Sequence, residues 1–235
     1  MPETLSKAEL AQLAKFDTPT ICNALEIVSP ERRAHGFNRR PLVCPFPEMK
    51  PIVGYARTAT IRSREPDSRT KTAARQLRVA YYEHIAAAPL PSLAMIQDID
   101  GPDRGFGAFW GEVQTTIHKA LGCIGTVTDG SVRDIDMMAS GFQVLAGSIM
   151  PSHAHVHLVD VACQVSIAGM IVDPGDLIHA DRHGAVVIPH AVAKKVPAAC
   201  DLLTRKEAVI LKAARKKGFS VEELKQALAK ADEIH

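Results

Sequence analysis

Residues 105–136 read GFGAFWGEVQTTIHKALGCIGTVTDGSVRDID and contain the most informative pattern in the chain. A glycine-rich loop leads into a predicted helix over 112–121, and a short apolar strand over 124–127 follows. A turn comes next, and directly after it stand Arg133 and Asp134. Side chains at the ends of strands commonly build the sites of α/β proteins. We therefore consider this stretch first as the place where a site would form.

The residue types in this stretch suit the binding of an organic acid and a divalent cation. The free N–H groups at the start of the 112–121 helix favour an anion such as a carboxylate. Arg133 offers a planar fork to a carboxylate, and Asp134 offers a hard oxygen ligand for Mg²⁺ or Mn²⁺. Glu112 is also typical of a helix start with no function at all. These residues can form a site only if the fold brings Arg133 and Asp134 opposite residue 112.

Outward from this stretch, the chain alternates strand and helix patterns. Alternating apolar residues predict a strand over 52–61, and four-residue spacing predicts an amphipathic helix over 70–88. A short apolar run predicts a strand over 93–99, and short segments between 156 and 188 predict further strands, partly antiparallel. The prediction is an α/β protein in which helices cover sheets. We also expect a short helix over 135–140.

Helices are predicted at both ends of the chain. Ser6 with Glu9, and Ser220 with Glu223, match the capping-box pattern that begins a helix. Thr18-Pro19 reads as a cap followed by proline at the first helical position, and one long helix is expected from Pro189 to about Lys217. No linker divides the chain, so we expect a single domain over 1–235, with a core of about 17–190 and a helical C-terminal extension of about 190–235.

Composition excludes several classes of protein. Hydrophobic residues make up 46% and charged residues 23% of the 235 residues, which is ordinary for a globular chain. The net charge of +2 gives no reason to expect nucleic acid or a membrane surface as partner. The N-terminus lacks the pattern of a signal peptide, and no apolar run approaches the ~20 residues that span a bilayer. We therefore expect a cytoplasmic protein. The arginines at 32, 33, 39 and 40 are read as a solvated surface or a subunit contact.

The central stretch resembles the signature of the RraA-like family. Glu112, twenty residues and then Arg133-Asp134 lie within the pattern GE…G-x-x-G-x-V-x-D-G-x-x-R-D. TPTICNAL at 18–25 and VDPGDLIHADRHGAVVIP at 172–189 are similar to two further segments of that family. The resemblance covers most of residues 17–210. The family includes class II 4-hydroxy-4-methyl-2-oxoglutarate/4-carboxy-4-hydroxy-2-oxoadipate aldolases and RraA regulators of ribonuclease E.

This resemblance implies a metal-dependent pyruvate lyase with Mg²⁺ or Mn²⁺ as cofactor. It implies a swivelling-domain-like layered sandwich with mixed sheets, assembled as homotrimers or homohexamers. Asp134 would bind the metal, and Arg133 would hold the carboxylate and keto oxygen of a small 2-oxo acid. The substrate contacts would extend to the helix start and the N-terminal segment, through Gly111, Val113, Gln114 and Asn23. Glu112 would bind metal-linked water, and so would Glu207 from a neighbouring subunit.

Two positions depart from the family pattern, because Glu112 and Asn23 stand where the family usually has Asp. The expected reaction is cleavage of a 4-hydroxy-2-oxo acid to pyruvate and a second carbonyl compound, with oxaloacetate decarboxylation as a side activity. The enolate of pyruvate is common to both reactions, and a metal with a nearby arginine would stabilise it. One alternative is a non-catalytic RraA-type regulator that binds a ribonuclease. Another is an enzyme that acts on a different, sugar-derived 2-oxo acid.

Two histidine-containing patterns remain outside this interpretation. His153, His155 and His157 would point to one face of a strand, where a second metal site is less expected than a polar face or a subunit contact. The pattern His179-x-Asp181-x-His183 suits either a pocket mouth or a structural turn. Trp110, the only tryptophan, is expected to serve in packing, with the wall of a pocket as the alternative.

Overall fold

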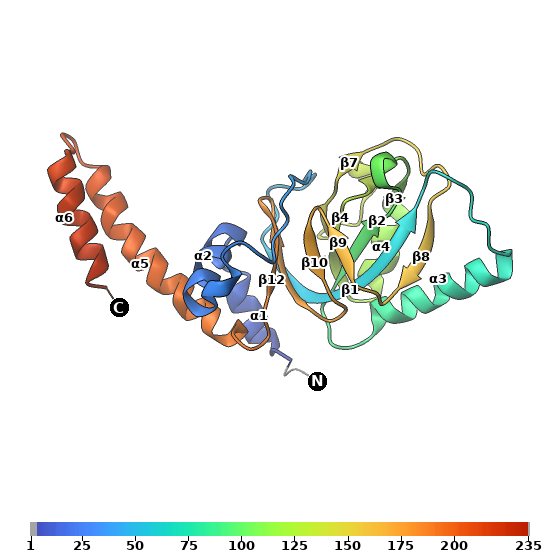
Figure 1. The fold of residues 1–235 in the computed structure, drawn as a ribbon, viewed down its shortest axis with the longest axis horizontal. Helices are drawn as coiled ribbons and strands as arrows, with labels where there is room; N and C mark the ends of the chain where they lie inside the picture. Colours follow the sequence, from blue (N-terminus) through green and yellow to red (C-terminus); the bar gives the residue numbers. More distant parts are fainter. Residues whose placement is uncertain (1–3, 235) are drawn as a thin grey trace.

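The computed structural model describes residues 4–234, so residues 1–3 and 235 of the predicted domain lie outside it. Its centre is a curled mixed sheet of seven strands in the order β12-β11-β1-β2-β4-β6, with β8 also paired to β1 (Figure 1). The strands are β1 (Ile52–Arg62), β2 (Ser92–Asp98), β4 (Cys123–Thr128), β6 (Gln143–Leu145), β8 (His157–Val161), β11 (Leu177–Asp181) and β12 (Gly184–Ile188). The predicted α/β class is confirmed.

Strand β1 organises the sheet because it has a different antiparallel neighbour at each end. Its first residues pair with β11 and its last with β8, while β2 runs parallel along its other edge. The predicted alternation of apolar side chains is confirmed. Val53 and Tyr55 lie in one buried cluster. Ala59 and Ile61, which have the same parity, lie in another. Ala56 has the opposite parity and enters a third cluster. Ten of the eleven residues of β1 are buried, so both faces of this strand are covered.

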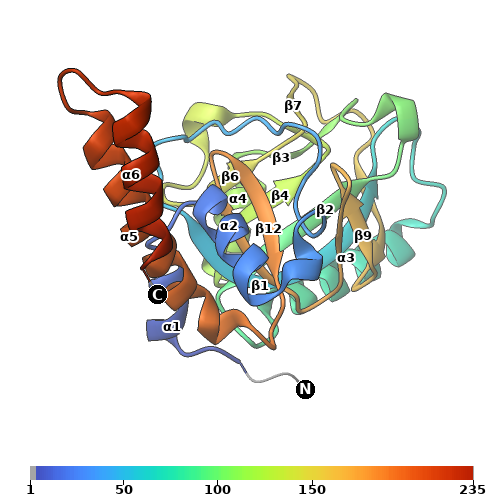
Figure 2. The same ribbon diagram turned by 60° about the vertical axis from the view of Figure 1, so that its left-hand side comes forward.

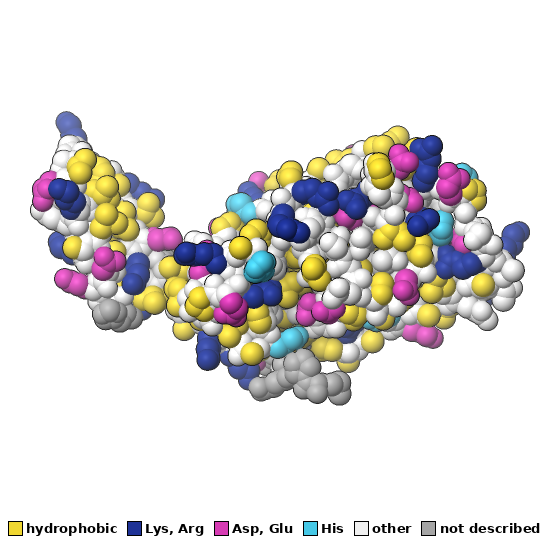
Figure 3. Space-filling view, viewed as in Figure 1, with side chains coloured by type: hydrophobic (Ala, Val, Ile, Leu, Met, Phe, Trp, Pro, Cys, Tyr) yellow, Lys and Arg dark blue, Asp and Glu magenta, His cyan; other side chains and the backbone are white. Residues whose placement is uncertain are grey.

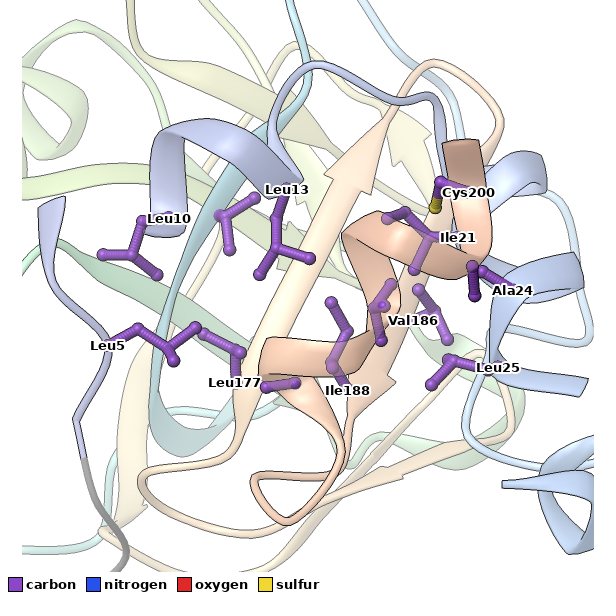
Figure 4. Close-up of a cluster of buried hydrophobic side chains, with 14 of the residues drawn as sticks. Leu5, Leu10, Leu13, Ile21, Ala24, Leu25, Leu177, Val186, Ile188 and Cys200 are labelled. Atoms are coloured by element: carbon purple, nitrogen blue, oxygen red, sulfur yellow. The ribbon is translucent and has the colours of Figure 1, made fainter. Parts of the chain in front are cut away.

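The helices cover the sheet in two groups. Helices α3 (Lys71–Ala86) and α4 (Glu112–Ala120) pack over the strands near the middle of the sheet. Helices α1 (Lys7–Leu13), α2 (Thr18–Val28) and α5 (Val196–Ala214) enclose the cluster shown in Figure 4, where leucines of α1 and α2 meet Leu177 and Ile188. Helix α5 continues into a hairpin with α6 (Val221–Asp232) that extends away from the body (Figures 1 and 2).

Two smaller sheets complete the fold. The hairpin of β9 (Val165–Ile167) and β10 (Met170–Val172) packs its apolar side chains against the main sheet. Three very short strands form a parallel sheet in the order β3-β5-β7, and the sequence did not predict it as a sheet. These strands are β3 (Ala108–Trp110), β5 (Ser131–Val132) and β7 (Ser148–Ile149). Within residues 4–234, no helix combines the length and apolarity needed to cross a bilayer.

The structure corrects the predicted start of two helices. Asp17, rather than Thr18, caps α2, since its Oδ1 accepts a hydrogen bond from the Thr20 N–H at 2.9 Å. The Thr18 N–H instead donates to Asp181 Oδ2 at 2.9 Å, which holds Thr18 as the first helical residue. Helix α5 begins only at Val196, after a 3-10 turn.

Two further predictions in the middle of the chain are wrong in extent. The helix expected over 135–140 is a 3-10 turn, Ile135–Met137. The three histidines do not share a strand face, because β8 begins at His157 and the positive φ of 44° at Ala154 interrupts an extended course. The ring nitrogens of His153 and His157 contact backbone carbonyls instead.

Candidate active site

The candidate site lies at the carboxyl edge of the small parallel sheet. Strands β3 and β5 run side by side with Trp110 opposite Val132, and the Arg133 N–H donates to the Trp110 carbonyl at 2.9 Å. The chain therefore leaves the two strands at neighbouring points. One exit leads through Gly111 into α4, and the other leads into Arg133-Asp134. Parallel pairing thus brings together two segments about twenty residues apart in the sequence.

Gly111 is the point of closest approach between the two segments. A Cβ atom at this position would lie 2.6 Å from Asp134 Oδ2 and 3.3 Å from Arg133 Cγ. No side chain fits there without displacing the Asp134 carboxylate, because real contacts of a Cβ atom are longer. The glycine therefore allows Asp134 to lie against the start of α4.

Asp134 itself has a left-handed backbone, with φ 54° and ψ 40°. Asp and Asn tolerate this conformation better than most residues, but it is still uncommon. Among residues 4–234, no hydrogen-bond donor reaches the Asp134 carboxylate, and its nearest cation is Arg133 Nε at 3.6 Å from Oδ2. Both side chains are more than a third exposed, at 38% for Arg133 and 37% for Asp134. A pair this exposed contributes little to folding, so both groups are available to a ligand.

The start of α4 presents open N–H groups to the same edge. Its N-cap residue is Gly111, which has no side chain to accept from the first turn. Glu112 and Val113 are exposed, while Gln114 is half-buried with its Oε1 accepting from the Tyr82 hydroxyl at 3.0 Å. The Gln114 side chain is thus committed to α3, and the backbone N–H groups of the first turn are the donors that face an incoming anion.

A buried polar network, which the sequence reasoning missed, fixes the orientation of α4. The Thr115 hydroxyl donates to the Gly111 carbonyl at 2.9 Å and accepts from the Ala139 N–H at 3.0 Å. It thereby ties the first turn of α4 to the segment that follows Asp134. A threonine one turn into a helix gives no distinctive sequence signal, so only the structure could reveal this role.

His118 anchors the far end of the same helix. Its Nδ1 lies 2.7 Å from the Gln114 carbonyl and therefore donates, which leaves Nε2 to accept from the Tyr81 hydroxyl at 2.7 Å. Burial lowers the pKa of His118 to about 4, so the ring is neutral near pH 7. Trp110 packs against this imidazole and is fully buried, as predicted.

The structure brings together six of the predicted site residues and separates two. Asn23 is exposed on α2, and Glu207 is exposed on α5; both helices pack with each other near β12, away from β3 and β5 (Figure 1). Within one chain, neither residue reaches the Arg133 edge. The six that converge are Gly111, Glu112, Val113, Gln114, Arg133 and Asp134.

The pattern His179-x-Asp181-x-His183 is structural. Asp181 accepts from the Thr18 N–H and, at 2.8 Å, from the His183 N–H. Burial opposes its charge, but these hydrogen bonds outweigh burial and lower the pKa of Asp181. His179 is buried between the Thr18 hydroxyl and the Phe16 carbonyl. The turn reading is therefore correct. Among residues 4–234, no group of three or more His, Cys, Asp or Glu side chains gathers as a metal site.

Comparison with known proteins gives several relatives. The chain is 28% identical over 197 residues to a Halalkalibacterium halodurans protein named "Putative 4-hydroxy-4-methyl-2-oxoglutarate aldolase", covering 82% of this chain and 83% of that protein. It is 34% identical over 96 residues to an uncharacterized protein of Methanocaldococcus jannaschii, covering 40% of this chain. The matched region spans only 46% of that archaeal protein.

The fold is shared with a solved structure from Streptomyces coelicolor, RraAS2, described as an unusual member of the RNase ES inhibitor RraA protein family. The TM-score is 0.69 at 20% identity, and the match covers 88% of this chain and 96% of that one. At this identity the likeness shows the fold alone. The family model described as RraA-like: Aldolase/RraA matches residues 18–187, which include the whole Gly111–Asp134 edge. The chain belongs to the RraA-like family.

Proposed function

We propose that this chain is a divalent-metal-dependent carbon–carbon lyase that cleaves a 4-hydroxy-2-oxo acid to pyruvate and a second carbonyl compound. The observation that carries the proposal is the convergence of Arg133, Asp134 and the open start of α4 over Gly111. An arginine fork and helix N–H groups suit the pyruvyl carboxylate, and a free carboxylate oxygen suits a hard cation. The relative named as an aldolase supports the same class of reaction.

The residues at this edge fit a weakly held Mg²⁺ or Mn²⁺. The Asp134 carboxylate is exposed and accepts no hydrogen bond from the described residues, so its oxygens are open to a ligand. Mg²⁺ commonly binds through one or two carboxylates while keeping several waters and substrate oxygens. Asp134 would hold the cation, and Glu112 would contact its water. Bound there, the cation supplies Lewis-acid polarisation of the 2-keto oxygen.

Arg133 acts on the same end of the substrate. Its guanidinium grips the carboxylate with two N–H groups and places a fixed positive charge beside the keto oxygen. The N–H groups of Val113 and Gln114 hold the other side of the carboxylate. When the C3–C4 bond breaks, its electron pair moves into the enolate of pyruvate, and these donors stabilise the negative charge that develops.

Glu112 is proposed to handle the proton. As C4 becomes a carbonyl carbon, the proton of its hydroxyl group must leave, and Glu112 at the first residue of α4 accepts it by way of water. Protonation of the enolate at C3 then gives pyruvate. Oxaloacetate would lose carbon dioxide to give the same enolate, so decarboxylation is expected as a side activity.

We further propose that a closed homotrimer or homohexamer completes the site. The Arg133 edge is open, while Glu207 lies on a helix that extends from the body with α6 (Figure 1). A neighbouring copy could therefore bring Glu207 to a water on the cation, which no residue of α5 does within one chain. Light scattering at micromolar protein concentration tests this assembly, and a monomer would contradict it.

The decisive experiment measures pyruvate release from a panel of 4-hydroxy-2-oxo acids and from oxaloacetate. Activity should disappear with EDTA and return with Mg²⁺ or Mn²⁺. Treatment with borohydride and substrate should leave the protein unmodified, because no lysine Schiff base is involved. If activity ignored EDTA and borohydride trapped a lysine, the mechanism would be wrong.

The same panel addresses the regulator alternative. The likeness to RraAS2 shows a shared fold and carries no function to this chain. A folded protein that released no pyruvate from any acid, with any metal, would favour binding to a ribonuclease over catalysis.

A further inference from the structure

A second candidate binding site lies away from the Arg133 edge. A cavity of about 620 Å³ opens between segment 32–39, the β9–β10 hairpin and the segment that follows β12. Figure 3 shows Lys/Arg and His side chains gathered over this part of the molecule, with Asp/Glu side chains beside them. The polar lining residues are Arg32, His35, Arg39, Asp173, Asp176 and His190. The volume falls within the ~300–1,000 Å³ range of small-molecule sites.

Both arginines are seated on glycines whose backbone is left-handed. Gly36 has φ 83°, and a Cβ there would overlap the Arg32 guanidinium. Gly169 has φ 87° in the β9–β10 turn, and a Cβ there would lie 2.8 Å from Arg39 Nε. Only glycine accommodates both the backbone and the side chain that crosses it. Arg32 is half-buried and Arg39 is exposed, and each guanidinium lies against the backbone of a glycine.

Each guanidinium retains unused donors. Arg32 Nη2 donates to the Val187 carbonyl at 3.4 Å, and Arg39 Nε donates to the Gly169 carbonyl at 3.1 Å. Across residues 4–234, no carboxylate lies within 4.0 Å of either group, and the buried Arg32 Nε has no hydrogen-bond partner. A buried charged donor without an acceptor is costly, and it points to a partner of negative charge.

The opposite wall of the cavity offers acceptors. Asp176 is half-buried, which raises its pKa, and its Oδ2 accepts from the Asp173 N–H at 2.9 Å. His190 stacks on Tyr55 with ring centroids 6.2 Å apart, and its Nε2 lies 3.1 Å from the Gly175 carbonyl. Carboxylates on this wall repel a highly charged anion but accept hydrogen bonds from hydroxyl groups.

We propose that this cavity binds a small polyhydroxylated organic acid, with its carboxylate on Arg32 and Arg39 and its hydroxyl groups facing Asp176 and His190. The two arginines supply the fork geometry that carboxylates prefer. The acidic wall selects a ligand that carries hydroxyl donors over a bare anion. This inference does not depend on the proposed lyase activity, because none of the cavity's residues belongs to the Arg133 edge.

Calorimetric titration with D-gluconate tests the proposal, with acetate and inorganic phosphate as bare-anion probes. We expect one gluconate per chain with a Kd of about 1 mM or tighter. Arg133→Ala should bind gluconate equally well, which separates this cavity from the proposed active site. Arg39→Gln should weaken binding about tenfold or more. Arg40→Gln is the matched control, because Arg40 is exposed like Arg39 but does not line the cavity.

A second variant protects the test against misfolding of the arginine mutants. Ile171 lines the cavity and is 59% exposed, so Ile171→Glu adds a negative charge to the wall without disturbing the core. It should weaken gluconate binding about tenfold as well. Absence of gluconate binding, or equal binding by Arg39→Gln and Arg40→Gln, would overturn the proposal. Tighter binding of phosphate than of gluconate would also overturn it, because the acidic wall predicts the opposite order.

Discussion

The molecule places aspartates at the carboxyl ends of parallel strands in two regions, with opposite results. At the β2–β4 end, Asp98 is fully buried and its carboxylate accepts from the N–H groups of Gly105 at 2.8 Å and Asp100 at 3.0 Å. Asp129 accepts from the Asp98 N–H at 2.9 Å and lies 3.1 Å from Arg104 Nε. The charged side chains of this region are thus engaged in contacts that hold its own loops.

At the β3–β5 end, the same residue types are left open. Asp134 and Arg133 are each more than a third exposed, and their only mutual contact is 3.6 Å long. Burial raises the pKa of both Asp98 and Asp129, whereas the Asp134 carboxylate is exposed to solvent. Position at a strand end therefore does not separate the proposed site from a structural contact in this molecule. The two regions differ in the number of hydrogen bonds that their carboxylates accept.

Mutation of Arg133 should give the largest functional effect and almost no structural one. Arg133→Ala removes the carboxylate grip and the fixed charge, so turnover should fall about 10²–10³-fold and KM should rise. Arg133→Lys keeps the charge but loses the fork, and it should recover only part of the activity. Pyruvate-release kinetics measure both constants, and urea unfolding should show stability within about 0.5 kcal/mol of wild type.

Arg182→Ala is the matched control for this experiment. Arg182 is also an exposed arginine with a long contact to a carboxylate, 3.9 Å from Glu48, but it lies outside the proposed site. Its removal should leave turnover unchanged. If Arg133→Ala lowered the free energy of unfolding enough to account for its loss of activity, the β3–β5 end would be structural like the β2–β4 end.

Mutation at the β2–β4 end should instead reduce the stability of the fold. Asp98→Ala leaves the buried N–H of Gly105 and the half-buried N–H of Asp100 without an acceptor, which should cost about 2–4 kcal/mol of unfolding free energy. Chemical denaturation measures the loss. Asp103→Ala is the control on the same loop, because Asp103 is exposed and pairs only with Arg64 at the surface. It should change stability by less than about 0.5 kcal/mol.

The loss of unfolding free energy in Asp98→Ala should also depend on pH. Because burial raises the pKa of Asp98, the folded protein takes up this proton before the unfolded chain does. Wild type therefore gains stability as the pH falls from neutral towards the unfolded value of about 3.9, and the variant lacks that gain. The difference between them should widen over this window. A difference that narrowed on acidification would show that Asp98 is stabilised as a carboxylate.

Much of the fold was predictable because its signals are local. The capping boxes at Ser6 and Ser220 and the alternation in β1 each depend on a few neighbouring residues, and all three are confirmed. The sheet β3-β5-β7 was missed because strands of two or three residues are too short to show a period. The sequence predicts Thr18 as the cap because its long-range hydrogen bond to Asp181 leaves no local signal.

The candidate site was predictable only in part. The signature pointed to Gly111, Glu112 and Arg133-Asp134, but the parallel pairing that joins them is a tertiary fact. Asn23 and Glu207 came from the same resemblance and lie elsewhere in the chain, so both roles stay predictions, and that of Glu207 depends on a neighbouring copy. The arginines of segment 32–40 are predicted as a solvated surface or a subunit contact, and three of them are exposed. That Arg32 and Arg39 lie against glycines beside a cavity depends on contacts between distant segments, which no local pattern shows.

Mutation of Glu112 should give the smallest effect on turnover of the variants at the β3–β5 end. It is the first residue of α4 and exposed, so it is either a proton acceptor or only a favourable charge at a helix start. Asp136→Asn provides the control, because Asp136 is another exposed acid beside the site with no proposed role. Its turnover should match wild type.

Glu112→Gln keeps the shape of the side chain and removes its basicity. Turnover should fall, but by less than in Arg133→Ala, because proton transfer through water loses its acceptor. KM should change little, since Arg133 and the α4 N–H groups hold the substrate. Glu112→Asp shortens the side chain by one methylene group, so it should also reduce turnover if the edge is adapted to Glu. Full activity in Glu112→Gln would show that this carboxylate serves only the helix, leaving Arg133 and Asp134 as the reactive pair.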